Sequence, residues 1–280
     1  MKAPTPTPTA PATTRRLVLA AALSFTGLFA ACGKTEAPAP APAASAPAAA
    51  PAPAKVYVVG TDAVYAPFES QNATGEIVGF DIDIVKAVAA KAGIEVKFVN
   101  TPWEGMFNTL GQGDRDILVS AVTITDERKQ SMDFSDPYFN ATQLIAVPAA
   151  SKVTSFNDLK KLRVAVQTGT TGDEAVGKLL GKTSAKLKRF ESTPLALQEL
   201  EAGGVDAVVA DNGVIAHYVA NNTGAKFKAV SDPAFVPEQY GLVVKKGNAE
   251  LLAKLNQGLA AVRADGSYDQ IFKQYFGDTK

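Results

Sequence analysis

The chain repeats one order of segments twice: strand, helix, strand, helix, strand. Apolar alternation predicts the strands, and apolar residues three and four positions apart predict the helices. The first unit has strands over 56–59, 94–98 and 116–120, with helices over 81–92 and from 101 to Gly111 or Gly113. The second has strands over 163–166, 187–190 and 203–211, with helices over 173–180 and from Thr193 onward. Two such units predict an α/β fold of two lobes, each built on a parallel βαβαβ sheet.

Local signals place several helix ends. Gly93 follows the first helical pattern and predicts its C-terminal stop. Thr101-Pro102-Trp103-Glu104 has the form of a capping box with proline at the first helical position, so we expect a helix to start there. After the second unit, apolar residues spaced along 251–262 and 268–276 predict two amphipathic helices that pack back on the first lobe.

Polar residues gather where the predicted strands end. In parallel sheets a ligand lies beyond the carboxyl ends of the strands, so two facing lobes place both sets of ends on one cleft. The residues there include an arginine whose fork matches a carboxylate, aspartates that match an ammonium group, and aromatic rings that can sandwich a side chain. The backbone N–H groups of Thr170-Thr171-Gly172, at a helix N-terminus, favour the same carboxylate. The expected set is Asp62, Tyr65, Trp103, Ser120, Ala121, Thr123, Arg128, Gln167, Thr170, Thr171 and Asp211.

Each of these residues also has a purely structural interpretation. Asp62 could cap a turn, Arg128 could belong to the solvated charge run 125–129, and Asp211 could be a helix N-cap. Trp103 and Tyr65 could be core residues. Their convergence on the predicted strand ends favours a binding site.

The composition excludes several classes of function. The 28 basic residues balance 28 acidic ones, without the positive face that a nucleic-acid-binding protein needs. One cysteine and one histidine make a zinc site improbable, and one cysteine cannot form a disulfide within the chain. No G-x-S-x-G motif, phosphate loop or nucleophile–base pair is present, so the chemistry indicated is recognition without a cofactor, not catalysis.

The N-terminus carries an export signal. Arg15 and Arg16 precede an apolar stretch from Leu17 to Ala31, which is too short to span a membrane comfortably. Residues 1–31 therefore predict a signal peptide. The following Cys32 resembles the acylated cysteine of a bacterial lipoprotein, although Phe29 stands where that motif usually has leucine. The alternative is an ordinary signal peptide with an incidental thiol.

Residues 32–54 are expected to form a tether. From 37 to 54 the sequence contains only alanine, proline and one serine, so it cannot build a core and predicts an extended, polyproline-like spacer. A lipid on Cys32 and this spacer would hold the folded part near a membrane.

Six segments of the chain resemble the periplasmic solute-binding proteins of polar amino-acid ABC transporters. They are GTDAVYAPFE (60–69), GFDIDIVKAVA (79–89), VTITDERKQSMDFSDPYF (122–139), VAVQTGTTGDEA (164–175), GGVDAVVADN (203–212) and VRADGSYDQIFKQYFG (262–277). The resemblance implies a type II periplasmic binding fold. Lobe 1 would comprise 55–139 and 240–280, lobe 2 would comprise 143–236, and two hinge strands would lie near 138–142 and 235–239.

The resemblance also implies roles for the candidate residues. Arg128 would clamp the ligand α-carboxylate together with main-chain donors near Thr123 and Thr171, while Asp211 and Ser120 would hold the α-ammonium. Tyr65 and Trp103 would stack on the ligand side chain, and Asp62 would contact the polar end of that side chain. The Trp103-Glu104 pair with Asp62 looks more like the branch that binds arginine and lysine, so a cationic amino acid is favoured, then glutamine or histidine. Where some relatives have lysine this chain has Gln167, so their preference cannot be copied.

The implied protein is a monomeric, non-enzymatic component of an ABC transporter. It would bind a free L-amino acid by closure of its lobes and then dock on an inner-membrane permease, in the periplasm. The lipid anchor would be its only contact with the membrane. Two alternatives share the fold: a periplasmic dehydratase of the cyclohexadienyl type, for which Glu104 could be the acid, and a ligand-sensing receptor subunit.

Overall fold

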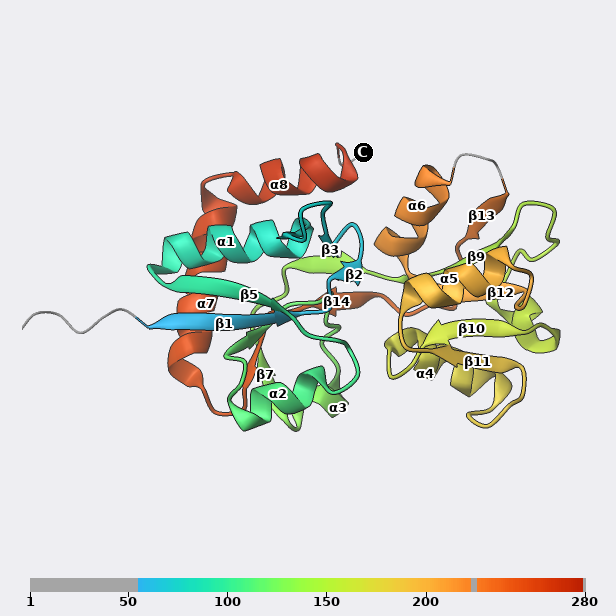
Figure 1. The fold of residues 1–280 in the computed structure, drawn as a ribbon, viewed down its shortest axis with the longest axis horizontal. Helices are drawn as coiled ribbons and strands as arrows, with labels where there is room; N and C mark the ends of the chain where they lie inside the picture. The colour runs from blue at the N-terminus through green and yellow to red at the C-terminus, as the bar shows by residue number, and fades with distance from the viewer. Residues whose placement is uncertain (1–54, 223–225, 279–280) are drawn as a thin grey trace, which may run out of the picture. The chain divides into compact units, whose positions relative to one another are not determined.

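The structure, a computed structural model, describes residues 55–222 and 226–278. The expected signal peptide, Cys32 and the Ala/Pro-rich spacer lie outside these ranges. Within them, no helix combines the length and the apolar character needed to cross a membrane. Two five-stranded sheets form the framework, each with helices on both faces (Figure 1).

The first sheet has the strand order β5-β1-β6-β15-β7. Its strands are β1 (Val56–Thr61), β5 (Glu95–Asn100), β6 (Ile117–Leu118), β7 (Met132–Phe134) and β15 (Val243–Lys245). One face packs against α1 (Phe80–Ala92), α7 (Ala249–Ala264) and α8 (Ser267–Phe276). The other packs against α2 (Met106–Gln112), and the short α3 (Asp126–Lys129) lies beside β7. We call this sheet and these helices the first lobe; α7 and α8 pack on it as the sequence predicts.

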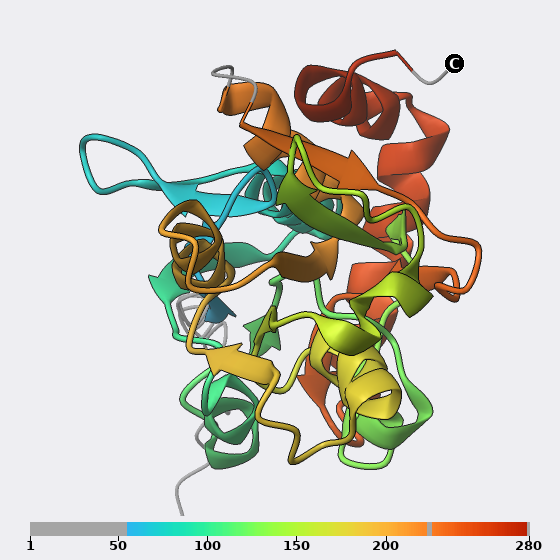
Figure 2. The same ribbon diagram turned by 90° about the vertical axis from the view of Figure 1, so that its right-hand side faces the viewer.

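The second sheet has the order β11-β10-β12-β9-β13. Its strands are β9 (Gln143–Pro148), β10 (Val164–Gln167), β11 (Leu187–Phe190), β12 (Ala207–Asp211) and β13 (Phe227–Val230). The helix α4 (Thr171–Leu180) and the 3-10 helix Phe156–Lys161 cover one face, and α5 (Thr193–Glu201) and α6 (Asn212–Asn221) cover the other (Figures 1 and 2). We call this unit the second lobe.

The two sheets share a topology, and both are mixed. The order β5-β1-β6 in one and β11-β10-β12 in the other is parallel, which is the predicted βαβαβ unit. Two further strands then extend each sheet. β15 and β9 run antiparallel to the unit, and β7 and β13 pair antiparallel with them at the edge of their sheets. The predicted βαβαβ unit is therefore present in each lobe, and each sheet is mixed because a strand from outside the repeat pairs with the last strand of the unit.

One predicted helix start is also wrong. Gly93 and Gly113 end α1 and α2 in the left-handed conformation, as expected. However, α2 begins at Met106, after a left-handed Gly105 that caps it without any side-chain bond. The hydroxyl of Thr101 is engaged elsewhere: it donates to the carbonyl of Val99 and accepts from Arg115 Nε, both at 3.0 Å. Trp103 and Glu104 therefore lie in a turn and not in a helix.

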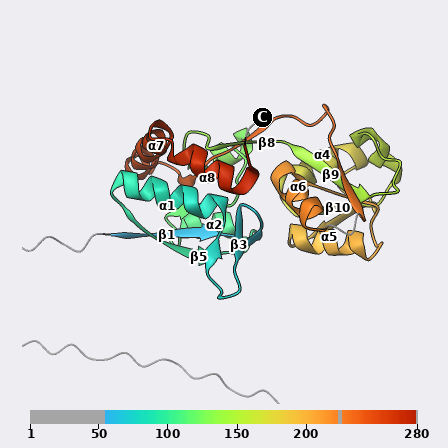
Figure 3. The same ribbon diagram turned by 90° about the horizontal axis from the view of Figure 1, so that it is seen from above.

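The chain passes between the lobes through a two-stranded ribbon. It consists of β8 (Phe139–Ala141) and β14 (Glu238–Tyr240), which pair antiparallel in the register Glu238↔Ala141. Figure 3 shows the crossing segments between the two sheets. β8 falls within the first range proposed as a hinge and β14 overlaps the second, and their flexing remains a prediction. A small sheet of β2 (Val64–Tyr65), β3 (Glu69–Gln71) and β4 (Ile77–Val78) lies on the first lobe.

An aromatic cluster packs beneath this ribbon. The Phe68 ring lies 5.0 Å from that of Phe139 and 5.4 Å from that of Tyr240, edge to face in both cases. Phe80 and Phe276 complete the cluster with a centroid separation of 5.1 Å. Such rings bury large apolar areas in fixed orientations. The C-terminal helix α8 is thereby joined to the same core as the first residues of the fold.

Candidate ligand-binding site

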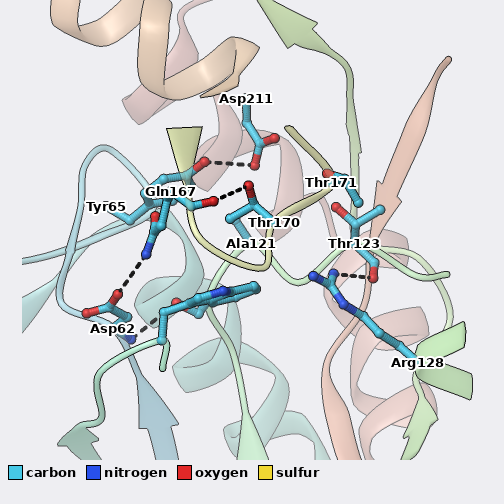
Figure 4. Close-up of a pocket in the computed structure, with 11 residues that line it drawn as sticks. Asp62, Tyr65, Ala121, Thr123, Arg128, Gln167, Thr170, Thr171 and Asp211 are labelled. Carbon is cyan, nitrogen blue, oxygen red and sulfur yellow. Dashed lines mark hydrogen bonds between the residues drawn. The ribbon is translucent and has the colours of Figure 1, made fainter. Parts of the chain in front are cut away.

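All eleven residues singled out in the sequence line one cavity (Figure 4). The space between them is about 330 Å³, part of which is open to solvent. Both lobes contribute to the lining. The cavity is therefore a place where two sets of strand ends meet, as the repeat in the sequence predicts.

The lining residues follow the ends of four parallel strands. Asp62 and Tyr65 follow β1, and Ser120, Ala121 and Thr123 follow β6. In the second lobe, Gln167 ends β10, Thr170 and Thr171 open α4, and Asp211 ends β12. Trp103 and Arg128 come from the turn before α2 and from α3. The carboxyl ends of parallel strands share one edge of a sheet, which explains the convergence.

Arg128 is held rigidly by its neighbours. Its Nη1 donates to the carbonyl of Thr123 at 2.9 Å, and its Nη2 lies 3.4 Å from the carbonyl of Gly169 in the other lobe. The guanidinium carbon lies 5.3 Å from the ring centre of Trp103 and 5.4 Å from that of Phe107, within cation–π range. Burial lowers the pKa of Arg128, and nearby carboxylates oppose this effect. Arg128 is thus not a member of a solvated charge run.

The start of α4 offers backbone donors to the same region. Thr170 caps the helix by accepting from the N–H of Asp173 at 3.1 Å. The N–H groups of Thr171 and Gly172, in the first turn, have no acceptor within the helix. A Cβ at Gly172 would lie 2.9 Å from Gln143 Oε1 and 3.2 Å from the carbonyl of Val209, so a side chain there would push Gln143 and the backbone of β12 aside. Arg128 and this helix start thus offer the kinds of donor that suit a carboxylate.

Asp211 carries a buried negative charge in the middle of the lining. Its Oδ2 accepts from Tyr240 at 2.6 Å and from Tyr65, in the other lobe, at 3.0 Å, while Gln143 donates to its Oδ1. Asp211 stands at the N-cap position of α6, but its side chain makes no capping bond to the helix and faces the cavity lining instead. Burial, and then the charge of Glu238, raise the pKa of Asp211 to about 6, and the three donors oppose this rise. A cationic group next to Asp211 would favour its ionised form and offset the cost of burying this charge.

Asp62 lies on the opposite side of the cavity from Arg128 (Figure 4). Burial raises its pKa, and bonds from the Trp103 backbone and the Gln167 side chain lower it. The bond from Gln167 Nε2 is long, at 3.5 Å. Gln167 itself is fixed by Thr193, whose hydroxyl donates to Gln167 Oε1 at 2.9 Å. Asp62 therefore presents a weakly tied carboxylate to whatever enters the cavity.

A pair of buried acids supports the floor of the cavity. Glu69 accepts from the Ser120 hydroxyl at 2.8 Å, and Asp81 accepts from the N–H of Ala121 and from the Tyr138 hydroxyl, both at 2.8 Å. Ala121 has φ of 47°, a strained value for a residue with a Cβ. Burial raises the pKa of Glu69 well above its usual range and that of Asp81 to about 6, so the protonated form of each acid is favoured relative to a solvated carboxyl.

Several residues of the site escape sequence reasoning. Gln143, Glu238 and Tyr240 bond to lining residues but carry no local motif that marks them. Glu69 and Asp81 lie in the segments 60–69 and 79–89 that resemble the family, but nothing in the sequence indicates what they do. By contrast, Glu104 is exposed and does not line the cavity. Within 55–222 and 226–278, no three histidine, cysteine, aspartate or glutamate residues cluster as a metal site requires.

Two lobes of shared topology with a charged cavity between them define a ligand-binding protein of the bilobal type. Residues 57–278 match the family model of bacterial extracellular solute-binding proteins, family 3. The chain belongs to this family. It is 49% identical to a probable histidine-binding protein of Neisseria gonorrhoeae over 79% of this chain and 83% of that protein. It is 34% identical to ABC transporter arginine-binding protein 1 of Escherichia coli, over 78% of this chain and 89% of that protein.

A solved structure extends the comparison to the fold. The arginine-, lysine-, histidine-binding protein ArtJ of Geobacillus stearothermophilus aligns with a TM-score of 0.78 and 46% identity. The alignment covers 81% of this chain and 97% of that chain. The two-lobed type II periplasmic binding fold predicted from the sequence is therefore confirmed.

Proposed function

We propose that this protein binds a basic L-amino acid (arginine, lysine or histidine) and presents it to the membrane permease of an ABC transporter. One observation carries the proposal: the charged residues of the cavity lining are Arg128, Asp211 and Asp62. A basic amino acid has three groups that complement them, namely its carboxylate, its α-ammonium and a cationic side chain. The lining has a net charge of −1 when all three residues are ionised, which matches a ligand of net charge +1.

Each charged group of the ligand has a stated partner in this proposal. The carboxylate takes two parallel bonds from Arg128 and further bonds from the N–H groups at the start of α4. The ammonium lies against Asp211, displacing its bond with the Tyr65 hydroxyl. The side chain extends towards Asp62, between the rings of Trp103 and Tyr65. Burial of so many charges is favourable only when all of them are paired, so the cavity selects against ligands that lack one of the groups.

The mechanism follows from the position of the cavity. Because its lining comes from both lobes, a ligand contacts both only when they are closed on each other. The ligand favours the closed arrangement to the extent that it binds that arrangement better than the open one. We propose that β8 and β14 act as the hinge strands, and that the closed form is the one recognised by the permease.

The proposal includes the location of the protein. Residues 1–31 act as a signal peptide, Cys32 receives the lipid, and residues 32–54 tether a monomeric binding unit in the periplasm. The relatives and solved structures described above bear names of binding proteins. Glu104, the acid considered for a dehydratase, is exposed and lies outside the lining, which favours binding over that alternative.

A thermal denaturation screen tests this function. The purified protein, stripped of any ligand by unfolding and refolding, is heated with each of the twenty amino acids. A ligand at a hundredfold excess over its Kd stabilises the native state by about 2.7 kcal/mol, which raises the midpoint by several degrees. We expect shifts with arginine, lysine or histidine. A shift with glutamine alone keeps the binding function but contradicts the basic ligand, and no shift with any amino acid overturns the proposal.

A further inference from the structure

One carboxylate joins the two lobes directly behind the cavity. Glu238 opens β14, on the ribbon between the lobes, and does not line the cavity. Its Oε2 accepts from the hydroxyl of Thr123 at 2.7 Å and from the hydroxyl of Thr171 at 2.9 Å. Its Oε1 accepts from Gln143 Nε2 at 3.2 Å. Thr123 belongs to the first lobe and Thr171 to the second, so hydroxyls of both lobes meet on a single oxygen.

The two threonines form the wall between the cavity and the outside. They line the cavity on the side of Arg128 (Figure 4), and they also line a separate, open hollow of the surface. Glu238 lines that hollow and not the cavity. Glu238 therefore lies on the outer side of this wall, away from the cavity. Since the threonine hydroxyls donate to Glu238, their hydrogens are not available to a ligand, and the carboxylate of a ligand must bond to Arg128 and to backbone N–H groups.

The geometry makes this contact specific to the closed arrangement. A hydrogen bond weakens steeply beyond about 3.5 Å, so a separation of the two threonines by one or two ångströms breaks at least one bond to the shared oxygen. Bonds to a charged acceptor are among the stronger ones in proteins. Glu238 thus stabilises closure, whereas a residue that only supports one lobe would not distinguish closed from open.

We propose that Glu238 is an interlobe latch: a positioning residue that holds Thr123 and Thr171 together behind the carboxylate-binding residues and slows the release of the ligand. The inference rests on the proposed function for the identity of the ligand, but not for the closure itself. A contact made only on closure should act on dissociation, because association begins with the open form. Its removal also lowers the fraction of closed molecules and with it the apparent affinity.

Three variants separate the latch from a general structural role. Glu238→Ala removes the acceptor, and Glu238→Gln keeps an oxygen for the threonine hydroxyls while removing the charge. Gln239→Ala changes the next residue of the same strand, whose exposed side chain bonds to Asn140 at 3.1 Å and to neither threonine. The variants are compared by stopped-flow kinetics, calorimetry and the small-angle X-ray scattering of the ligand-free protein.

We expect Glu238→Ala to raise the dissociation rate at least tenfold with an association rate within threefold of the wild type, and to increase the radius of gyration. Glu238→Gln should recover most of the wild-type rate, and Gln239→Ala should match the wild type. Loss of binding through the association rate alone, or kinetics and scattering unchanged in Glu238→Ala, overturns the latch. If the wild type binds none of the amino acids, the proposed ligand is wrong, and the scattering comparison still decides whether Glu238 favours closure.

Discussion

The two ends of the cavity are built differently. At the end of Arg128, which we call the main-chain end, Thr123 and Thr171 of the two lobes donate to one oxygen of Glu238 at 2.7 and 2.9 Å, and Arg128 donates to the carbonyl of Thr123 at 2.9 Å. At the end of Asp62, the side-chain end, the bond from Gln167 across the lobes is 3.5 Å long. All amino acids share the groups proposed to bind at the first end and differ in those at the second. The rigid end would therefore keep the scaffold specific for amino acids in general, and the adjustable end would decide which amino acid is preferred.

The strongest test of the main-chain end is Arg128→Ala. Removing the guanidinium leaves the ligand carboxylate buried without its partner, at a cost of about 3–5 kcal/mol, or roughly two to three and a half decades of affinity. Because this end contacts only groups common to all amino acids, the loss should be the same for every ligand, as measured by calorimetry.

Arg163→Ala is the matched control, since Arg163 is exposed and pairs with Asp206 at 2.7 Å, away from the cavity lining. Its affinity should equal that of the wild type. A loss of less than threefold in Arg128→Ala would remove Arg128 from the site.

Asp211 makes the main-chain end sensitive to pH. It must be ionised to hold the ammonium, and without ligand its pKa is raised to about 6. The proton competes with the ligand below that value, so the affinity for arginine should fall towards tenfold per pH unit as the pH drops below 6, and should be flat above 7. Calorimetry with arginine measures this without titration of the ligand side chain. Asp211→Asn should bind arginine about ten- to a hundredfold more weakly than the wild type, and its affinity should no longer depend on pH. If the variant keeps the pH profile of the wild type, another group is responsible for the titration.

The side-chain end should control preference. Asp62→Asn removes the negative charge that faces the ligand side chain, so the affinity for arginine should fall about tenfold while that for glutamine stays equal or rises. The quantity to measure is the ratio of the arginine affinity to the glutamine affinity, and not either affinity alone. Asp114→Asn, at an exposed position outside the lining, provides the control. An equal loss for both ligands would place Asp62 among the groups that recognise the common part of the amino acid.

The smallest effect on binding is expected from Glu69→Gln, beneath the floor. Glutamine resembles the protonated acid: it can accept from Ser120 and donate to Asp81. The folded-state pKa of Glu69 is raised, so the folded protein holds more protons than the unfolded one and this group's contribution to stability falls as pH rises. Relative to wild type, Glu69→Gln should therefore gain a few degrees in Tm at pH 8 and little at pH 5. Its ligand affinity should stay within threefold.

Glu76→Gln, an exposed change in the loop that follows β3, should show no such trend. A Tm difference between Glu69→Gln and wild type that does not depend on pH would show that Glu69 is not protonated in the folded state.

The features that could be predicted from the sequence are those set by residues close to one another in the chain. Apolar periodicity and the glycines at 93 and 113 suffice for the βαβαβ units and their helix ends. The strand ends suffice for nine of the eleven lining residues, whereas Trp103 and Arg128 come from a turn and from α3. Thr101 shows the limit: its capping pattern is sound, but Arg115, fourteen residues away, takes the hydroxyl that the cap requires.

Residues that act through distant partners could not be found in this way. Tyr240 meets Asp211, and Glu238 meets Thr123 over 115 positions, only because the ribbon returns the chain to the cavity. No local pattern encodes such a meeting. The antiparallel strands β15 and β13 were missed for the same reason, since each pairs with a strand far from it in sequence.

The order of the strands along the chain has a consequence for how the protein is made. Every strand of the second sheet lies between residues 143 and 230, so this sheet can complete its pairing while the chain is still being synthesised or exported. The first sheet must wait for β15, and its core for α7 and α8 at the far end of the chain. Contacts between such distant segments form slowly. A chain that stalls or is cut before residue 243 would therefore carry one finished lobe and one exposed aromatic core, which is the form that aggregation and proteolysis would act on first.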